Sequence, residues 1–395
     1  MKKNFLFTSE AVTDGHPDRL CDSISDAVVD RFLKKDPYSR IIAECALSKN
    51  VLFLAARFAS DVNIDIPDIA REVMAGVGYR DEDFDAANCS VLTSLIPMPM
   101  AQRAQADEKD LSHGELDRLT VHSQVSVFGF ACTQTPELMP LPISLANRLT
   151  RAMTAARSNR KLGLLSPDCT VQVGVEYVNG VPVRIPSITV IAGSVAHHKV
   201  GSVELRERLV NQVLTPMFAE EPVQPDGDSE IFVNPQGAFP KSGPASHSGM
   251  TGRKTAADTY GAYARHSGSA LSGKDPTRID RVGAYMARYA AKNVVAADLA
   301  DECEVQLSYA IGHAGPISIQ VQTFGTGLLD DLEITKRVEE VFDFRLGAII
   351  RDFNLRHLPS LHPTGFYQNL PVQGHIGSTT LKLPWESTDT AQSLR

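Results

Sequence analysis

The sequence predicts an α+β protein made of three similar units, and two observations carry this prediction. The chain has 395 residues, which is long enough for two or three hydrophobic cores rather than one. One order of elements, a helix, a two-stranded hairpin and a second helix, returns three times along it without repeated sequence identity. With 43% hydrophobic and 22% charged residues, the composition is that of a globular protein and excludes a disordered or fibrous one.

The first unit begins with an amphipathic helix predicted over residues 18–33. Apolar residues recur there at every fourth position, so they share one helical face. They are Leu20, Ile24, Val28 and Phe32. Two strand-like runs follow at 40–48 and 51–58. A second helix is predicted at 67–77, because proline stands at its first position.

The second and third units repeat this order. The second has a helix at 143–157, strands at 170–177 and 184–192, and a helix at 203–214. Asn179-Gly180 between its strands is a strong hairpin turn signal. The third has a helix at 281–297, strands at 304–311 and 317–323, and a helix at 334–344. Each unit has roughly 100 to 130 residues, a size typical of a single domain.

The predicted boundaries follow these units. They are an N-terminal domain at 1–102, a linker at 103–118, a central domain at 119–233, a C-terminal domain at 234–380 and a polar tail at 381–395. The wider segment 97–119 has no convincing period and predicts a mobile loop. Loops of this length often act as lids.

Charge and cysteine content limit the partners and the compartment. The 39 Lys and Arg against 47 Asp and Glu give a net charge of −8, which argues against a general nucleic-acid surface. No apolar window is long enough for a membrane span or a secretory signal, so we expect neither membrane association nor export. The six cysteines form no Cys-x-x-Cys pair, which indicates reduced, mostly buried thiols and a cytoplasmic protein.

The first stretch that core packing does not explain is Thr13-Asp14-Gly15-His16-Pro17-Asp18, at the start of the first helix. Pro17 suits the first helical position, and the helix N-terminus can face an anion. His16 is then poised to contact a phosphate or leaving group, and Asp18 to bind a metal. The alternative is that His16 only caps the helix and Asp18 complements its dipole.

The second stretch runs from 237 to 281 and combines glycines with Thr, Lys and Arg. Its clusters are Gly249-Met-Thr-Gly-Arg-Lys254 and Ser272-Gly-Lys-Asp-Pro-Thr-Arg-Ile-Asp280. Glycines let the backbone approach phosphate oxygens while cations neutralise them. The spacing is not that of a P-loop, and Asp280 among these cations suggests a divalent metal bound to oligophosphate. The alternative is a set of basic, glycine-rich surface loops.

Four segments carry a family resemblance. They are FTSEAVTDGHPDRLCDSISDAVVD, TPELMPLPI, GMTGRKTAADTYG and SGKDPTRIDRVGAYMARYAAKNVVAADLADECEVQLSYAIG. The chain resembles the S-adenosylmethionine synthetase (methionine adenosyltransferase) family over residues 4–375. The resemblance implies an α+β fold of three similar α/β-sandwich domains around a pseudo-threefold axis. It also implies a homodimer or dimer of dimers, with active sites between paired subunits.

The chemistry that the resemblance implies is adenosyl transfer. A methionine sulfur attacks C5′ of ATP, triphosphate leaves, and it is then cleaved to pyrophosphate and phosphate. By resemblance, His16 lies at the leaving oxygen, and Arg253, Lys254 and Lys274 hold phosphates. Asp18 and Asp280 hold Mg²⁺, two ions being expected, and Glu44 lies at a K⁺ site. Phe239 stacks on adenine, and Asp168 contacts the ribose or the adenine.

The acceptor side departs from the family pattern. The expected residues are replaced by Arg57 for glutamate, Met98 for glutamine, Ser123 for aspartate, His247 for aspartate and Arg278 for lysine. With Gln124 and Ile311, these positions make up the predicted acceptor pocket. Acids are lost and Arg57 is gained, a change that repels an ammonium and attracts a carboxylate.

These departures leave several functions open. The acceptor is L-methionine or a related thioether or thiol acid without the free α-amino group. One alternative is an ATP or tripolyphosphate hydrolase that has lost alkyl transfer. Another is a non-catalytic partner subunit of a complete synthetase.

Overall fold

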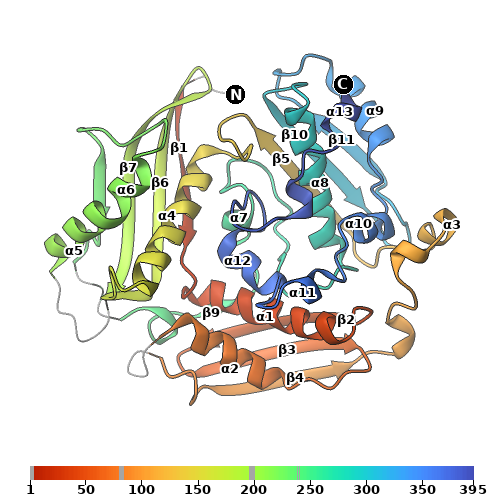
Figure 1. Cartoon of the computed structure of the whole chain (residues 1–395), viewed down its shortest axis with the longest axis horizontal. Coiled ribbons are helices and arrows are strands. Elements are labelled where there is room, and N and C mark those ends of the chain that lie inside the picture. Colours follow the sequence, from red (N-terminus) through yellow and green to blue (C-terminus); the bar gives the residue numbers. More distant parts are fainter. Residues whose placement is uncertain (1–3, 80–83, 195–200, 238, 240) are drawn as a thin grey trace.

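A computed structural model describes residues 4–79, 84–194, 201–237, 239 and 241–395. Figure 1 shows three β-sheets arranged around a central group of helices, with one long helix on the inner face of each sheet. The three sheets and their helices are related by an approximate threefold axis. This arrangement confirms the predicted α+β fold of three similar units.

The first sheet carries α1 on its inner face. Its strands, in order, are β4 (Ser90–Pro97), β3 (Val51–Ala59), β2 (Arg40–Ser48) and β9 (Gly249–Met250). The helices are α1 (Pro17–Lys35) and α2 (Ile66–Val77). The predicted helix, hairpin and helix are confirmed, whereas β4 was not predicted.

The second sheet has the predicted hairpin at its centre. Its strands are β1 (Phe5–Val12), β6 (Leu165–Val178), β7 (Val181–Ser194) and β8 (Glu230–Val233). Its helices are α4 (Leu141–Ser158), α5 (Ser202–Leu209), a π-helical turn (Val210–Leu214) and α6 (Thr215–Phe218). Asn179 and Gly180 have φ values of 53° and 82°, as the predicted hairpin turn requires.

The third sheet packs on α8. Its strands are β11 (Ser318–Gln322), β10 (Glu302–Tyr309) and β5 (Val125–Cys132), and its helices are α8 (Ile279–Ala296), α9 (Asp331–Val341) and α10 (Leu346–Asp352). α9 begins three residues before the predicted start because the Asp330 side chain caps it, accepting from the N–H of Glu333.

Shorter helices complete the description. They are η1 (Met100–Gln102), η2 (Glu108–Asp110), α3 (His113–Leu116), η4 (Gly243–Ala245), α7 (Thr255–Asp258), α11 (Leu358–Leu361), η5 (Tyr367–Asn369), α12 (Leu370–Gln373), η6 (Pro384–Glu386) and α13 (Ala391–Leu394). The segment 97–119 therefore contains three short helical turns. Two buried or half-buried ion pairs, Arg103–Asp36 and Arg356–Glu108, tie it to the rest of the protein.

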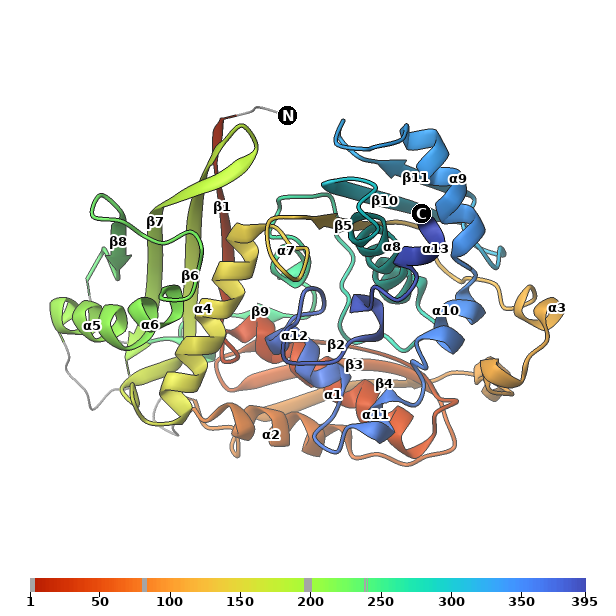
Figure 2. The same cartoon turned by 45° about the horizontal axis from the view of Figure 1, so that its top comes forward.

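The three units exchange strands. β1 pairs with β6 of the central unit, β5 pairs with β10 of the third, and β9 pairs with β2 of the first. The exchange brings the glycine-rich segment around residue 250 against the start of α1 (Figure 2). Two stretches that lie far apart in the sequence thus meet at one place.

The outer face of the first sheet is apolar and exposed. Since side chains alternate along a strand, the register places five large apolar residues on the side away from α1. They are Val51, Phe53, Leu92, Ile96 and Met250, each between 47% and 56% exposed. Glu44 and Arg57 share this face, which we call the outer sheet face.

Two further sequence expectations concern membranes and thiols. No helix in the described part of the chain is both long and apolar enough to cross a membrane. All six cysteines are unpaired and buried, as predicted.

Candidate active site

The site is built on the N-terminus of α1. Pro17 occupies its first turn, and His16 is the N-cap residue. The His16 Nδ1 accepts a hydrogen bond of 3.2 Å from the N–H of Asp18. The chain before it is held by β6, because the N–H of Gly15 donates to the carbonyl of Pro167 at 3.2 Å. The capping role considered from the sequence is therefore real, and within the described part of the chain no hydrogen bond engages Nε2 of His16.

His16 is neutral in this environment. Burial lowers its pKa to about 4, and the nearby Lys254 and His247 add to the effect, against Asp168 and Asp18. Because Nδ1 accepts from a backbone N–H, the neutral ring carries its proton on Nε2. His16 can therefore donate a hydrogen bond to an oxygen without carrying a charge.

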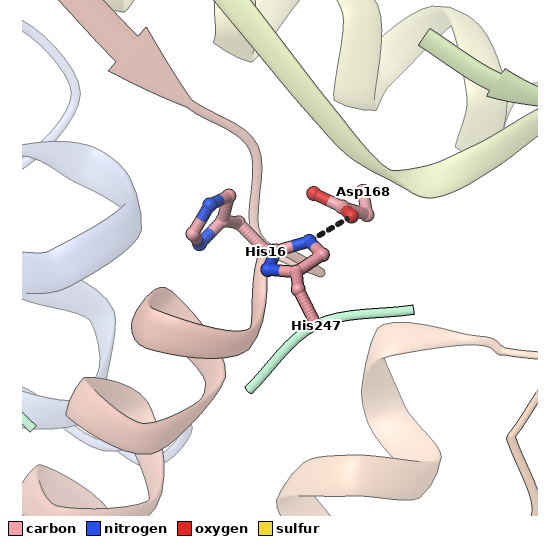
Figure 3. A group of neighbouring side chains, drawn as sticks. All are labelled: His16, Asp168 and His247. Atoms are coloured by element: carbon pink, nitrogen blue, oxygen red, sulfur yellow. Dashed lines mark hydrogen bonds and ion pairs between the residues drawn. The ribbon is translucent and has the colours of Figure 1, made fainter. Parts of the chain in front are cut away.

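His247 lies beside His16, as Figure 3 shows. The two ring centroids are 5.0 Å apart. The Asp168 Oδ2 is 2.8 Å from Nε2 of His247 and accepts from the N–H of Gly243 at 2.7 Å. The hydrogen bond with Asp168 raises the pKa of His247. Predicted for the acceptor side, His247 thus contacts two residues predicted for the ATP side.

These three side chains also form a possible metal-ligand group. One ligand atom from each of His16, Asp168 and His247 lies within 4.8 Å of the others. The group differs from the predicted metal ligands Asp18, Asp280 and Glu44. Lys254 acts on both imidazoles and opposes a further cation there.

Acidic residues on α1 hold the two glycine-rich segments in place. Asp18, Asp22 and Asp26 accept hydrogen bonds of 2.7–3.0 Å from the backbone N–H groups of Met250, Gly252 and Gly273 respectively. All three are buried. Their spacing of four residues places them on one helical face. Sequence reasoning missed this role, although aspartates at every fourth position of an apolar helix were a visible signal.

Glycine is required at two positions where these segments approach neighbouring backbone. A Cβ at Gly249 would lie 2.1 Å from the backbone carbon of Pro17. A Cβ at Gly273 would lie 2.0 Å from the carbonyl oxygen of Ala43, and Gly273 has a φ of +77°. In the structure these two glycines approach α1 and β2, and the predicted approach to phosphate oxygens stays a prediction.

The predicted phosphate cations surround the aspartates. Arg253 and Lys254 lie 3.6 Å and 3.5 Å from the carboxylate of Asp18. Lys274 lies 3.5 Å from Asp280, and burial lowers its pKa although Asp280 and Glu44 oppose this. Arg253 is half exposed, so part of this charge is free to meet an anion.

Buried ion pairs also hold the two glycine-rich segments and α1 in place. Arg281 donates to both carboxylate oxygens of Asp26, at 2.7 and 3.0 Å, and to the carbonyl of Lys274. Arg19 is paired with Asp258 and lies 3.7 Å from Asp22. Because each of these charges is fully buried, the pairs fix the loop positions closely.

The remaining predicted residues are dispersed. Arg57 is exposed on the outer sheet face, and Met98 is buried after β4. Ser123 and Gln124 precede β5, and Arg278 is the N-cap residue of α8. Ile311 is exposed after β10, and Phe239 is half-buried. Within the described residues, no hydrogen bond or ion pair joins any two of the predicted acceptor-pocket side chains. The chain by itself thus groups the ATP-side residues more closely than the acceptor-side ones.

This geometry defines a class of protein. His16 at the N-terminus of α1, with Arg253 and Lys254 beside the buried Asp18, has the donors and the positive charge that suit an oligophosphate, and Lys274 beside Asp280 adds a further cation, in an α+β protein of three units. An enzyme that acts on a nucleoside triphosphate fits this arrangement.

Comparison with known proteins specifies the family. Three descriptions of one family match the chain: the S-adenosylmethionine synthetase N-terminal domain over 4–98, the central domain over 118–239 and the C-terminal domain over 241–387. Proteins named S-adenosylmethionine synthase from Gloeothece citriformis (strain PCC 7424) and Acaryochloris marina (strain MBIC 11017) are 43% and 45% identical, over 100% of this chain and 97% of theirs. The chain belongs to the S-adenosylmethionine synthetase family.

Proposed function

We propose that this protein transfers the adenosyl group of ATP to the sulfur of methionine, giving S-adenosylmethionine. The S–C5′ bond forms as the C5′–O bond breaks, and the electron pair of that bond leaves with triphosphate. Water then cleaves triphosphate to pyrophosphate and phosphate. The observation that carries the proposal is the position of His16 at the start of α1 beside Asp18, with Arg253 and Lys254 3.6 Å and 3.5 Å from the Asp18 carboxylate.

The proposed role of each residue follows from its charge. A thioether sulfur needs no base, so catalysis depends on orienting it and on stabilising the departing oxygen. The Nε2–H of His16 donates to that oxygen, while Arg253, Lys254 and Lys274 neutralise the phosphates. Asp168 orients His247 beside this group, and Phe239 stacks on adenine.

The carboxylates fit a magnesium site. Mg²⁺ prefers one or two carboxylates together with substrate phosphates. Asp18 and Asp280 each lie beside phosphate-binding cations, at 3.5–3.6 Å, and would hold two ions once the phosphates bind. The ions would supply neutralisation of the triphosphate charge. Glu44, exposed on the outer sheet face near Lys274, would hold K⁺.

We propose a homodimer, or a dimer of such dimers, formed through the outer sheet face. Its five exposed apolar side chains are suited to burial against a second copy. Dimerisation would carry Glu44 and Arg57 into sites between subunits, which accounts for the scattered acceptor residues of the single chain. We also infer that the protein works in the cytoplasm, a proposal supported by six unpaired thiols.

The acceptor pocket is proposed to favour a carboxylate over an ammonium. Arg57 is exposed on the outer sheet face, and no carboxylate of the described residues forms an ion pair with it. L-methionine and thioether or thiol acids without the α-amino group are therefore the acceptors to compare.

The test is product analysis with a panel of acceptors. Purified protein, ATP, Mg²⁺ and K⁺ are incubated with each acceptor, and adenosylated products are measured by mass spectrometry. An S-adenosyl sulfonium supports the proposal, and the preferred acceptor identifies the pocket. Phosphate release without adenosylated product indicates a hydrolase. No turnover alone, together with a stable complex with a complete synthetase, indicates a partner subunit.

A further inference from the structure

A cavity of about 530 Å³ lies between the segment 101–106, the start of β2 and the N-terminal end of α8. Arg40 of β2, Thr277 before α8 and His122 before β5 line it, and Leu346 and Ile350 of α10 form an apolar side. None of these residues has a role in the proposed reaction. The cavity is therefore considered separately from the site at the start of α1.

Cations outnumber acids around this cavity. Its lining includes four arginines and two glutamates. Arg356 donates to both carboxylate oxygens of Glu108 at 2.7 and 2.6 Å, and Arg118 lies 4.0 Å from Glu115. Arg103 donates twice to Asp36 at 2.9 and 2.7 Å. Three of the four arginines thus have an acidic partner.

Arg40 is the arginine without one. It is only 7% exposed, and its Nε has no hydrogen-bond partner in the described part of the chain. Burial lowers its pKa, and Arg278 and Arg356 act in the same direction against Asp275. The oxygens of Asp275 already accept from the N–H groups of Ile41 and Thr277, each at 2.7 Å. A buried guanidinium without a hydrogen-bond acceptor destabilises the folded protein unless a bound ligand supplies one.

Two neighbouring groups are unpartnered in the same way. Thr277 Oγ1 and Arg278 Nε are buried and have no partner among the described residues. Burial lowers the pKa of His122, and Arg40 and Arg278 lower it further, so these three side chains share one positive potential. Arg40, Thr277 and His122, from different segments, line the cavity, and Arg40 Nε and Thr277 Oγ1 have no hydrogen-bond partner among the described residues.

We propose that this cavity is an oxyanion-binding site. A carboxylate or phosphate group is held by the guanidinium of Arg40 and the hydroxyl of Thr277, and His122 lines the cavity beside them. The site is independent of the proposed adenosyl transfer. Its occupant connects the segment 101–106 to the start of β2, because residues from both line the cavity.

The test is anion-dependent stabilisation without ATP. Inorganic phosphate and acetate are titrated separately, at constant ionic strength, against an Arg253→Met/Lys254→Met/Lys274→Met background that removes the three ATP-side cations. Melting temperature and calorimetric titration report binding. The site predicts saturable binding in this background, and which anion binds more tightly distinguishes a phosphate from a carboxylate ligand. Absence of binding by both anions overturns the proposal.

Three variants added to this background assign the binding to the cavity. Arg40→Gln is expected to weaken binding about tenfold or more, and Thr277→Val about threefold. Thr277→Val removes an unpartnered buried hydroxyl, so the anion-free protein keeps or gains stability. Arg103→Met, which lines the same cavity but is paired, lowers stability without changing the affinity. If the anion affinity is unchanged in both Arg40→Gln and Thr277→Val, the proposal is contradicted. Two variants are used so that the test still stands when one of them folds poorly.

Discussion

His16 illustrates how one side chain serves folding and chemistry through different atoms. Its Nδ1 caps α1, while Nε2, which makes no hydrogen bond with the described residues, is the atom proposed to donate toward the leaving oxygen. Burial keeps the ring neutral by lowering its pKa to about 4. An uncharged donor suits an oxygen whose negative charge is taken up mainly by the surrounding cations.

The two roles of His16 can be separated with His16→Asn. Asparagine is among the best N-cap residues, so thermal stability is expected to change little. The side chain is too short to replace Nε2, and kcat is expected to fall about 10²- to 10³-fold, as for loss of one donor to a developing oxyanion. Steady-state kinetics and thermal melting measure both. A kcat within threefold of the wild type would show that His16 only caps the helix.

Asp30 gives a pH-dependent prediction. Burial raises its pKa to about 7, although the N–H groups of Tyr367 and Gln368 donate to it. A carboxyl whose pKa is raised on folding binds its proton more tightly in the folded state, so its contribution to stability falls as pH rises from about 4 through 7. The wild type should therefore lose stability relative to Asp30→Asn between pH 5 and pH 8. Urea unfolding at both pH values measures this, and an equal difference at both would contradict it.

At the scale of elements, the glycine-rich segments depend on contacts that only glycine permits. Gly273→Ala would force a Cβ against the carbonyl of Ala43 at 2.0 Å, in a residue with φ +77°. Gly180→Ala is a matched control, because Gly180 has φ +82° but nothing within 4 Å of its Cβ position. We expect the control to lose about 1 kcal/mol of unfolding free energy and Gly273→Ala to lose at least twice as much. Gly273→Ala should also raise the KM for ATP by displacing Lys274.

Equal losses in the two glycine variants would mean that the backbone conformation matters and the contact with β2 does not. Chemical denaturation of both variants under the same conditions gives this comparison. The KM for ATP of Gly180→Ala, measured in parallel, should match that of the wild type, because Gly180 lies in a hairpin turn of the second sheet.

Local patterns predicted the long helices and the central hairpins. The apolar period of α1 and the Asn179-Gly180 turn are properties of neighbouring residues, and the structure confirms both. The pairings of β1, β5 and β9 join residues more than a hundred positions apart, so no local period marks them. The candidate ATP-side residues, chosen from compact motifs and the family resemblance, stay predictions. The hydrogen bond of His247 with Asp168 and the lack of an acidic partner for Arg40 among the described residues depend on tertiary structure, so the sequence does not reveal them.

At the scale of the whole molecule, the outer sheet face predicts association. Phe53→Glu places a charge among the five apolar side chains and should convert a dimer to a monomer of 42.9 kDa. Val203→Glu, at a residue 72% exposed on α5, is the control and should leave the mass unchanged. Light scattering after size exclusion gives the masses. A monomeric wild type with full activity would contradict the proposed intersubunit site.

The most direct test of the central claim follows the carbon atom whose bond changes. ATP labelled with ¹³C at C5′ is incubated with the protein, Mg²⁺, K⁺ and L-methionine or the best acceptor of the panel, and the C5′ resonance is observed by NMR. Adenosyl transfer predicts that C5′ moves from an oxygen-bonded to a sulfonium-bonded shift, with pyrophosphate and phosphate appearing in step. Release of phosphate while C5′ keeps its bond to oxygen would contradict the proposed function.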